Sequence, residues 1–171
     1  ANKLGLHVHI WMQCFYDGEW HNPAHTDLTN KINEAKKYAE IPNIYGVHLD
    51  YLRYPGNAYK TEGATEAVNN FTRKVKEVTG DKFLSCAIMP EEDNQYYYGQ
   101  DAQTLGQICD VVIPMQYKGN YEAGTAWLAS TTKMFSGMAN IWSGLQSYLN
   151  DDDTTILGEY ELTQDINTCL D

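Results

Sequence analysis

The chain has 171 residues, of which 43% are hydrophobic and 20% are charged, and its formal net charge at pH 7 is -11. This length and composition are typical of one globular domain and exclude a disordered or fibrous chain. The negative charge disfavours nucleic acid as a partner, and no apolar stretch reaches the roughly 20 residues of a membrane-spanning helix, so we expect neither nucleic-acid binding nor membrane insertion.

Five strand-then-helix units follow one another along the chain, joined by polar segments. The predicted strands cover residues 4–15, 44–50, 82–89, 109–115 and 140–147. The predicted helices cover residues 29–40, 64–79, 101–107, 125–136 and 161–170, and a long acidic loop through residues 151–153 precedes the last of them. Strict alternation of strands and helices indicates a parallel sheet with helical crossovers.

The side-chain pattern within the strands favours a barrel over an open sheet. In the first predicted strand, apolar side chains alternate with a second set that comprises His7, His9, Trp11 and Gln13. The apolar face suits a covering layer of helices, and the mixed face suits a barrel interior whose mouth is an active site. A doubly wound sheet carries helices on both faces and would be apolar on both. We therefore predict an α/β fold, a parallel (β/α) barrel of the TIM type.

Five units do not close such a barrel, because a complete (β/α)₈ barrel has eight units and about 250 residues. We expect residues 1–171 to form a single segment of an incomplete (β/α)₈ barrel within a longer chain. A small open sheet that is complete in itself is the alternative.

Residues 46–55 are the most informative segment of the sequence. An apolar strand ends there in the carboxylate of Asp50, which is followed by Tyr51 and Arg53, and Pro55 prevents the strand from continuing. Side chains at the carboxyl ends of parallel strands line the ligand crevice of α/β proteins. Asp50 is therefore a candidate catalytic group. The alternative is an Asp50–Arg53 ion pair that only fixes a loop.

A second carboxylate follows the next predicted strand. Glycoside hydrolysis usually needs two carboxyl groups that flank the scissile bond, and Glu91 has the same predicted facing as Asp50. Neighbouring strands lie about 4.8 Å apart, so groups at their ends can reach the roughly 5–5.5 Å separation of a retaining pair or the wider separation of an inverting pair. We predict Asp50 and Glu91 as the catalytic residues. A solvated acidic loop over residues 91–93 is the alternative.

Aromatic, amide and imidazole side chains at or near the other strand ends are candidates for binding a sugar. The predicted substrate-binding residues are His9, Trp11, His48, Tyr51, Arg53, Gln116, Tyr117, Gln146 and Tyr148. Tyrosine and tryptophan suit such a surface because each combines an apolar ring with a polar group. Packing inside the protein is the alternative for the two glutamines and for Trp11.

Cofactor and metal chemistry has little support in the sequence. No phosphate-binding glycine motif, zinc-type cysteine pair or serine-nucleophile motif occurs. His7 and His9 share one strand face and suggest a metal site, but no histidine follows His48, so the later strands offer only carboxylates as ligands. We expect no cofactor and no bound metal.

Three segments resemble a known family. They are residues 7–11 (HVHIW), 46–55 (GVHLDYLRYP) and 110–117 (DVVIPMQY). In this order they resemble the glycoside-hydrolase-like TIM-barrel proteins, a group that includes bacterial enzymes acting on cell-wall glycan and is distantly related to the chitinase and α-amylase-type barrels. The pattern HLDYxRYP in the second segment is the most specific, and the order and spacing cover nearly the whole chain.

The resemblance implies a catalytic or substrate-binding role for Asp50, with Tyr51 and Arg53 beside it, and places Glu91 near the end of the following strand. The sequence departs from the chitinase pattern at two places. Lys118 stands where chitinase-type barrels have an aspartate, and their motif DxxDxDxE is not matched. These departures disfavour a substrate-assisted mechanism and favour one with two carboxylates.

The sequence thus predicts a glycoside hydrolase that acts on a cell-wall or extracellular polysaccharide by a two-carboxylate acid/base mechanism. We expect it outside the cell or at the cell surface. The alternatives are a glycan-binding barrel of a surface protein without catalysis and, less favoured, a metal-dependent deacetylase.

Overall fold

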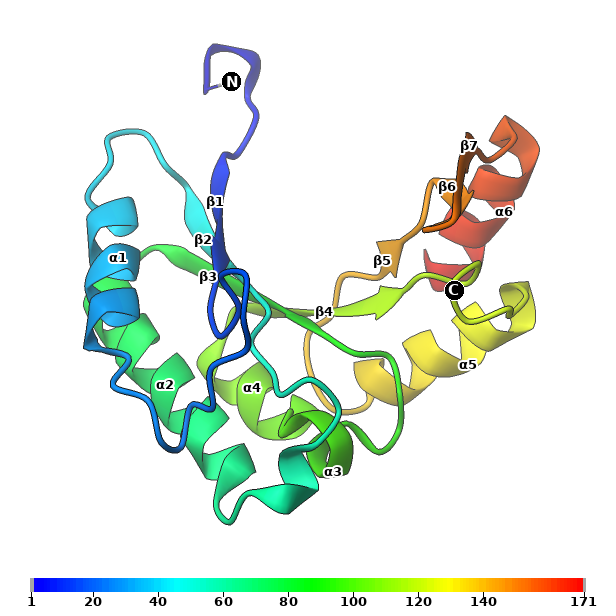
Figure 1. Cartoon of the computed structure of the whole chain (residues 1–171). Helices are drawn as coiled ribbons and strands as arrows, with labels where there is room; N and C mark the ends of the chain where they lie inside the picture. The colour runs from blue at the N-terminus through cyan, green and yellow to red at the C-terminus, as the bar shows by residue number, and fades with distance from the viewer. Residues whose placement is uncertain (1, 171) are drawn as a thin grey trace.

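The computed structural model describes residues 2–170 and contains a five-stranded parallel sheet (Figure 1). Its strands, which pair in chain order, are β1 (His9–Gln13), β2 (Gly46–Asp50), β3 (Phe83–Ile88), β4 (Val111–Gln116) and β5 (Gly144–Leu145). Every pair between neighbouring strands is parallel. Each crossover therefore returns the chain beside the strand it has just left, which is the arrangement of a (β/α) barrel.

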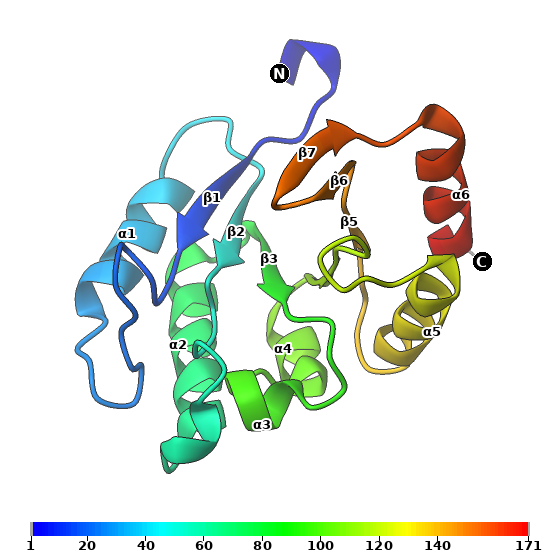
Figure 2. The ribbon, with the colours of Figure 1, turned by 45° about the vertical axis from the view of Figure 1, so that its right-hand side comes forward.

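Helices cover one face of this sheet. The helices are α1 (Thr29–Ala39), α2 (Ala64–Thr79), α3 (Asn94–Tyr98), α4 (Ala102–Ile108), α5 (Thr125–Ser136) and α6 (Glu159–Leu170), and two 3₁₀ turns are η1 (Asn2–Leu4) and η2 (Ala58–Lys60). Figures 1 and 2 show α1, α2, α4 and α5 on the same side of the strands. The predicted fold class is confirmed. None of the described helices combines the length and the apolar character that crossing a membrane requires.

The core lies between the sheet and these helices. On α2 the buried residues Val68, Phe71 and Val75 recur at the spacing of one helix face. They face the buried side chains of β2 and β3, which include Val47, Leu49, Leu84 and Cys86. Full burial of a side chain of this size stabilises the fold by about 1.5–3 kcal/mol. The alternation predicted from the sequence therefore places the apolar side chains under the helices.

The first strand is shorter than predicted. The sequence pattern extends over residues 4–15, but β1 begins at His9. Gly5 adopts a φ of 71°, which is incompatible with an extended strand, and Leu4 and Leu6 are exposed. β2 starts at Gly46, opposite His9, and of the described residues before β1 only Val8 bonds to this neighbour, where its carbonyl accepts from the N–H groups of Tyr45 and Gly46.

The region after β4 also differs from the prediction. The expected strand over residues 140–147 is reduced to β5 and an isolated bridge at Ile141. In place of an acidic loop, β6 (Tyr148–Asn150) and β7 (Asp153–Ile156) form an antiparallel hairpin. Asn150 closes its turn, because its side-chain oxygen accepts hydrogen bonds from the backbone N–H groups of Asp152 and Asp153. The acidic residues are thereby held in a defined turn.

A buried ion pair fastens α6 to the segment after β4. The ammonium group of Lys118 lies 2.6 Å from Asp165 Oδ2 and 2.7 Å from Glu161 Oε1. Burial alone lowers the pKa of Lys118, but the hydrogen bonds and charges of the two carboxylates outweigh this effect and raise it above its usual value. Lys118, which departs from the chitinase pattern, thus has a structural role in this chain.

The substitution Lys118→Met tests this role. It leaves Asp165 buried without its counter-charge, which costs about 3–5 kcal/mol, so we expect the free energy of unfolding in urea to fall by that amount. Lys133→Met, at an exposed lysine of α5, is the matched control and should change the stability little. The double variant Lys118→Met/Asp165→Leu should recover part of the loss, and a single variant as stable as the unchanged protein would contradict this account.

Candidate functional site

Asp50 lies at the carboxyl end of β2 with both carboxylate oxygens engaged. Oδ1 accepts a hydrogen bond of 2.7 Å from the backbone N–H of Tyr51, and Oδ2 accepts one of 2.9 Å from Nε1 of Trp11. Among the described residues, Arg53 forms no ion pair with Asp50 or any other carboxylate. The alternative of an Asp50–Arg53 pair is therefore wrong. Instead, β1 and the backbone after β2 orient the carboxylate.

The backbone turns sharply at Tyr51. Its φ of 50° lies in the left-handed region, which costs a bulky residue about 1–3 kcal/mol. The Tyr51 ring stacks on Tyr16 with 5.0 Å between the ring centres and lies 5.7 Å from the centre of Trp20. These contacts offset the strain. Such strain is concentrated at functional sites.

Arg53 is surrounded by aromatic rings. Its guanidinium carbon lies 4.7 Å from the ring centre of Trp20, 5.7 Å from that of Tyr98 and 6.0 Å from that of Tyr51. Contacts of this kind stabilise a cation by about 0.5–2 kcal/mol and fix its position. Arg53 therefore presents a positioned positive charge beside Asp50.

A hollow of about 450 Å³ opens next to these residues. Its lining comprises Asp50, Tyr51, Arg53, Met89, Met115, Tyr117, Asn120, Tyr121 and Asp151. Residues from the ends of β2, β3 and β4 thus meet residues of the turn between β6 and β7. The hollow contains two carboxylates, Asp50 and Asp151. Asp151 accepts hydrogen bonds from the side chain of Asn120 at 2.9 Å and from the hydroxyl of Tyr148 at 3.0 Å.

Tyr117 lies between these charges. Burial raises the pKa of its hydroxyl, and the negative charge of Asp50, the neighbouring Tyr148 and the negative charge of Asp151 raise it further. The hydroxyl therefore keeps its proton at neutral pH and can donate a hydrogen bond to a ligand oxygen. The hollow thus contains Tyr51, Arg53 and Tyr117 together with Asp50, and Tyr148 contacts Asp151.

Glu91 lies in an adjoining hollow of about 410 Å³. Its Oε1 accepts hydrogen bonds from the hydroxyls of Tyr98 at 3.0 Å and Tyr121 at 2.9 Å, and its Oε2 is buried without a partner. Burial, together with the charge and hydrogen bond of Glu91, raises the pKa of Tyr98 to about 12. Tyr121 lines both hollows. Asp50 lines only the first and Glu91 only the second, so the two predicted catalytic carboxylates do not share one hollow.

The two histidines occupy different depths of the sheet. His9 pairs with Gly46 at the start of β2, four positions before the level of Asp50, which is a distance of about 13 Å along a strand. Its ring packs against Tyr45 and Phe83. His9, a predicted substrate-binding residue, is therefore not among the residues that line the hollow at Asp50. His48 is only two positions from Asp50, and its Nδ1 lies 2.9 Å from Ser85 Oγ.

Both glutamines are buried and bonded within the protein. Gln116 lies under α5, where its amide donates to the carbonyl of Leu128 and the hydroxyl of Thr132. Gln146 accepts from the N–H of Gly119 and donates to Asn120. Gln116 and Gln146, both predicted as substrate-binding residues, therefore bond within the protein and do not line the hollow at Asp50. Gln146 instead fixes the segment that carries Asn120.

Gly119 allows a close approach of this segment to the β6–β7 hairpin. A Cβ atom at position 119 would collide with the backbone carbonyl of Leu149 in β6. The hairpin and the segment after β4 therefore pack backbone against backbone.

The sequence did not predict Asn120, Tyr121 and Asp151 as lining residues of the Asp50 hollow. The only signal for them was the place of the first two after the fourth predicted strand and of Asp151 in the acidic run.

No known protein family and no curated protein matches this sequence. Solved structures do show the same fold. The glycoside hydrolase domain of PgaB (BpsB) from Bordetella bronchiseptica is similar with a TM-score of 0.74 and 11% identity, over 96% of this chain and 67% of that domain. A chitinase from Chromobacterium violaceum is similar with a TM-score of 0.65 and 14% identity, over 86% of this chain and 51% of the chitinase.

The spore cortex-lytic enzyme SleL from Bacillus megaterium is similar with a TM-score of 0.64 and 16% identity, over 83% of this chain. This chain spans only 36% of the length of SleL. The resemblance in structure is thus to parts of polysaccharide-active glycoside hydrolases. At these identities the likeness establishes the fold, a partial TIM barrel, and the distant structural resemblance to this class of protein.

The buried position of His48 predicts a dependence of stability on pH. Burial lowers its pKa below the usual 6.5, while the charge of Asp50 raises it and that of His9 lowers it further. Because the unfolded chain binds this proton more readily, the stabilising contribution is complete above about pH 6.5 and is lost as the pH falls through the folded-state pKa. We expect the His48 ring to titrate below 6.5 by NMR.

The variant His48→Gln should therefore lose less stability than the unchanged protein between pH 7.5 and pH 5.5, a window that spans roughly one unit on either side of the usual histidine value. His25→Gln, at an exposed histidine, serves as the control and should retain the original dependence on pH. Identical pH profiles for the His48 variant and the unchanged protein would contradict the assignment.

Proposed function

We propose that this chain forms part of a glycoside hydrolase that acts on a cell-wall or other extracellular polysaccharide. The observation that carries the proposal is the carboxylate of Asp50, fixed by Trp11 and Tyr51 at the edge of a hollow that also contains Arg53 and Tyr117. The resemblance in fold to a chitinase and to a glycoside hydrolase domain supports it. Since such a polysaccharide lies outside the cytoplasm, we also propose an extracellular or surface location.

Asp50 is the proposed nucleophile or base. Trp11 donates to one of its oxygens and the backbone of Tyr51 to the other, so the group is held in one orientation and keeps a free lone pair on each oxygen. The exposed Trp11 ring and the ring of Tyr51 offer flat surfaces for a sugar, and the Tyr117 hydroxyl can donate to its oxygens. These side chains would bind and orient the polysaccharide.

The second carboxyl group has two candidates in the structure. Glu91, the residue predicted as general acid, is anchored by two tyrosine hydroxyls, one of which belongs to Tyr121 at the boundary of the Asp50 hollow. Asp151 lies in the same hollow as Asp50. Hydrolysis requires both groups to flank one bond at a separation of about 5–9.5 Å. Glu91 remains our proposed acid because Tyr121, to which it is bonded, lines both hollows, and Asp151 is the alternative because it lines the Asp50 hollow itself.

A non-catalytic glycan-binding role is the second candidate function. It is favoured by one observation, namely that Asp50 and Glu91 line different hollows. In that case the aromatic rings and Arg53 would hold a sugar chain and no bond would be cleaved.

We also propose that the five units belong to a closed barrel, because the parallel edges at β1 and β5 are suited to pairing with further strands.

The substitution Asp50→Asn distinguishes the two functions. If Asp50 acts in hydrolysis, the release of reducing ends from cell-wall polysaccharide should become undetectable while the affinity for the polysaccharide stays nearly unchanged, because asparagine keeps the size and the hydrogen-bonding oxygen. Asp152→Asn, at the exposed neighbouring turn, is the matched control and should hydrolyse at the original rate. An unaltered rate in Asp50→Asn would remove this residue from the mechanism.

Separate substitutions identify the second carboxyl group. Loss of a general acid typically lowers the rate by about 10²–10⁴-fold, so we expect this decrease in kcat for Glu91→Gln and a smaller change for Asp151→Asn. Glu77→Gln, on the exposed face of α2, is the control for Glu91→Gln. The reverse order of the two effects would assign the acid to Asp151, and polysaccharide binding without hydrolysis in the unchanged protein would establish the non-catalytic function.

A further inference from the structure

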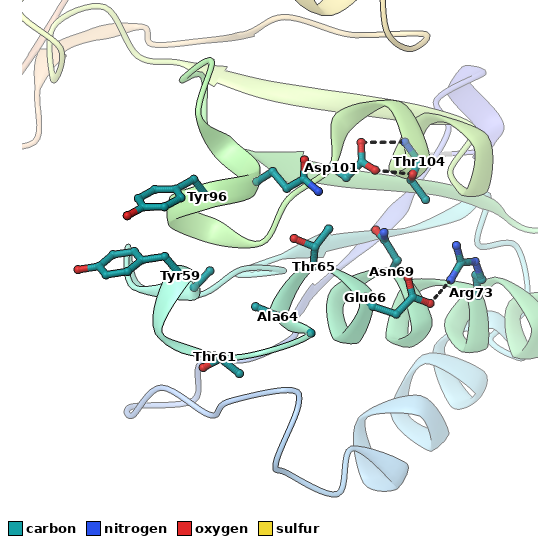
Figure 3. A pocket seen from close by; sticks show the side chains of 13 residues that line it. Tyr59, Thr61, Ala64, Thr65, Glu66, Asn69, Arg73, Tyr96, Asp101 and Thr104 are labelled. Carbon is teal, nitrogen blue, oxygen red and sulfur yellow. Dashed lines mark hydrogen bonds and ion pairs between the residues drawn. The ribbon is translucent and has the colours of Figure 1, made fainter.

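Another hollow, of about 650 Å³ and thus larger than those at Asp50 and Glu91, lies on the helical side of the molecule, between the first half of α2 and the α3–α4 segment (Figure 3). It shares no lining residue with the hollow at Asp50. Its volume lies within the range of small-molecule sites, about 300–1,000 Å³. Nothing in the proposed function uses it.

A buried side chain in this hollow lacks a hydrogen-bond partner. Asn69 on α2 is 3% exposed, and its Oδ1 has no partner. Figure 3 shows its amide extending from α2 toward Asp101 and Thr104 on the opposite wall. Asp101 accepts from both the N–H and the hydroxyl of Thr104, so this wall supplies no donor to Asn69. An unpaired buried acceptor costs about 1–3 kcal/mol, and nearly all such groups are paired. Oδ1 of Asn69 can therefore accept a hydrogen bond from a donor group of a ligand.

Two stacked tyrosines stand at one end of the hollow. The rings of Tyr59 and Tyr96 are 4.9 Å apart and nearly parallel, at 7°. Their exposures of 50% and 55% are high for aromatic residues, and Figure 3 shows both side chains at the same end of the groove. Ring edges and phenolic hydroxyls together suit the C–H groups and hydroxyls of a sugar.

The charges of the lining select against an anionic ligand. The only cation among the lining residues, Arg73, is already paired with Glu66 at 3.1 Å, and Asp101 adds an uncompensated negative charge. An anion would be repelled there. The remaining polar groups are neutral hydroxyls and amides, such as Thr65 and Gln95, which exchange hydrogen bonds with hydroxyl groups.

We propose that this hollow is a second binding site, for a neutral oligosaccharide, distinct from the Asp50 hollow. A sugar hydroxyl donates to Oδ1 of Asn69, and Tyr59 and Tyr96 contact the sugar ring at the end of the groove. The site would hold a polysaccharide on the outer, helical surface, whichever of the two candidate functions the Asp50 hollow performs.

The test is an NMR titration of the protein with three soluble neutral probes: cellopentaose, laminaripentaose and penta-N-acetylchitopentaose. At least one should shift the side-chain amide signal of Asn69 and the backbone signals of Thr65 and Thr104. Tyr96→Ala should weaken this binding at least about tenfold, or about 1.4 kcal/mol. Tyr160→Ala, at a tyrosine of α6 that is 77% exposed, is the matched control and should bind as the unchanged protein does.

Asn69→Leu separates a ligand-binding role from a structural one. Leucine has the same branched arrangement of side-chain heavy atoms as asparagine and removes the unpaired acceptor, so this variant should lose oligosaccharide binding while its melting temperature is unchanged or raised. Asp50→Asn and Trp11→Ala should leave the shifts at Asn69 intact, which separates this site from the proposed hydrolytic one. Absence of shifts at Asn69 with all three probes, unimpaired binding by Asn69→Leu, or preferential binding of trigalacturonate would overturn the proposal.

Discussion

The parallel pairing of consecutive strands is the constraint on which the rest of this structure depends. Because β1 to β5 run in the same direction and pair in chain order, their carboxyl ends meet at one edge of the sheet. The register sets Gln13 opposite Asp50 and Trp11 opposite His48. Trp11 is thus two residues before the level of Asp50 and on the same face, where its indole N–H reaches the Asp50 carboxylate. A slip of one residue would turn Asp50 toward α1 and α2. The candidate site exists because the register excludes that slip.

The alternation of apolar and polar residues accounts for how much of this architecture the sequence alone predicts. The helix over residues 64–79 is found with the predicted bounds, since Gly80 ends it and three apolar positions define its buried face. Asp50 was predictable as a strand-end carboxylate for the same reason. The two-residue period of a strand also indicates that the neighbours Gln116 and Tyr117 face opposite sides of the sheet, so that the two side chains do not both face the Asp50 hollow.

Other parts of the site depend on contacts between segments far apart in the sequence, which no local pattern specifies. Asp151 reaches the Asp50 hollow only because residues 148–156 fold as a hairpin, and an acidic run preceded by one asparagine is equally typical of a loop. Glu91 lies beyond the end of β3, where alternation no longer fixes the direction of a side chain. Two tyrosines from separate segments, Tyr98 and Tyr121, decide its position instead.

The contact at Gly119 couples two segments mechanically. With no side chain at this position, the carbonyl of Leu149 rests directly on the loop backbone, and Gln146 and Asn120 add hydrogen bonds across the same junction. Asn120 also bonds to Asp151 through both its side-chain amide and its side-chain oxygen, so the segment after β4 and the turn of the hairpin are held against each other. An alanine at position 119 would force the two segments apart, and Asn120 and Asp151 would then leave their places in the lining of the Asp50 hollow.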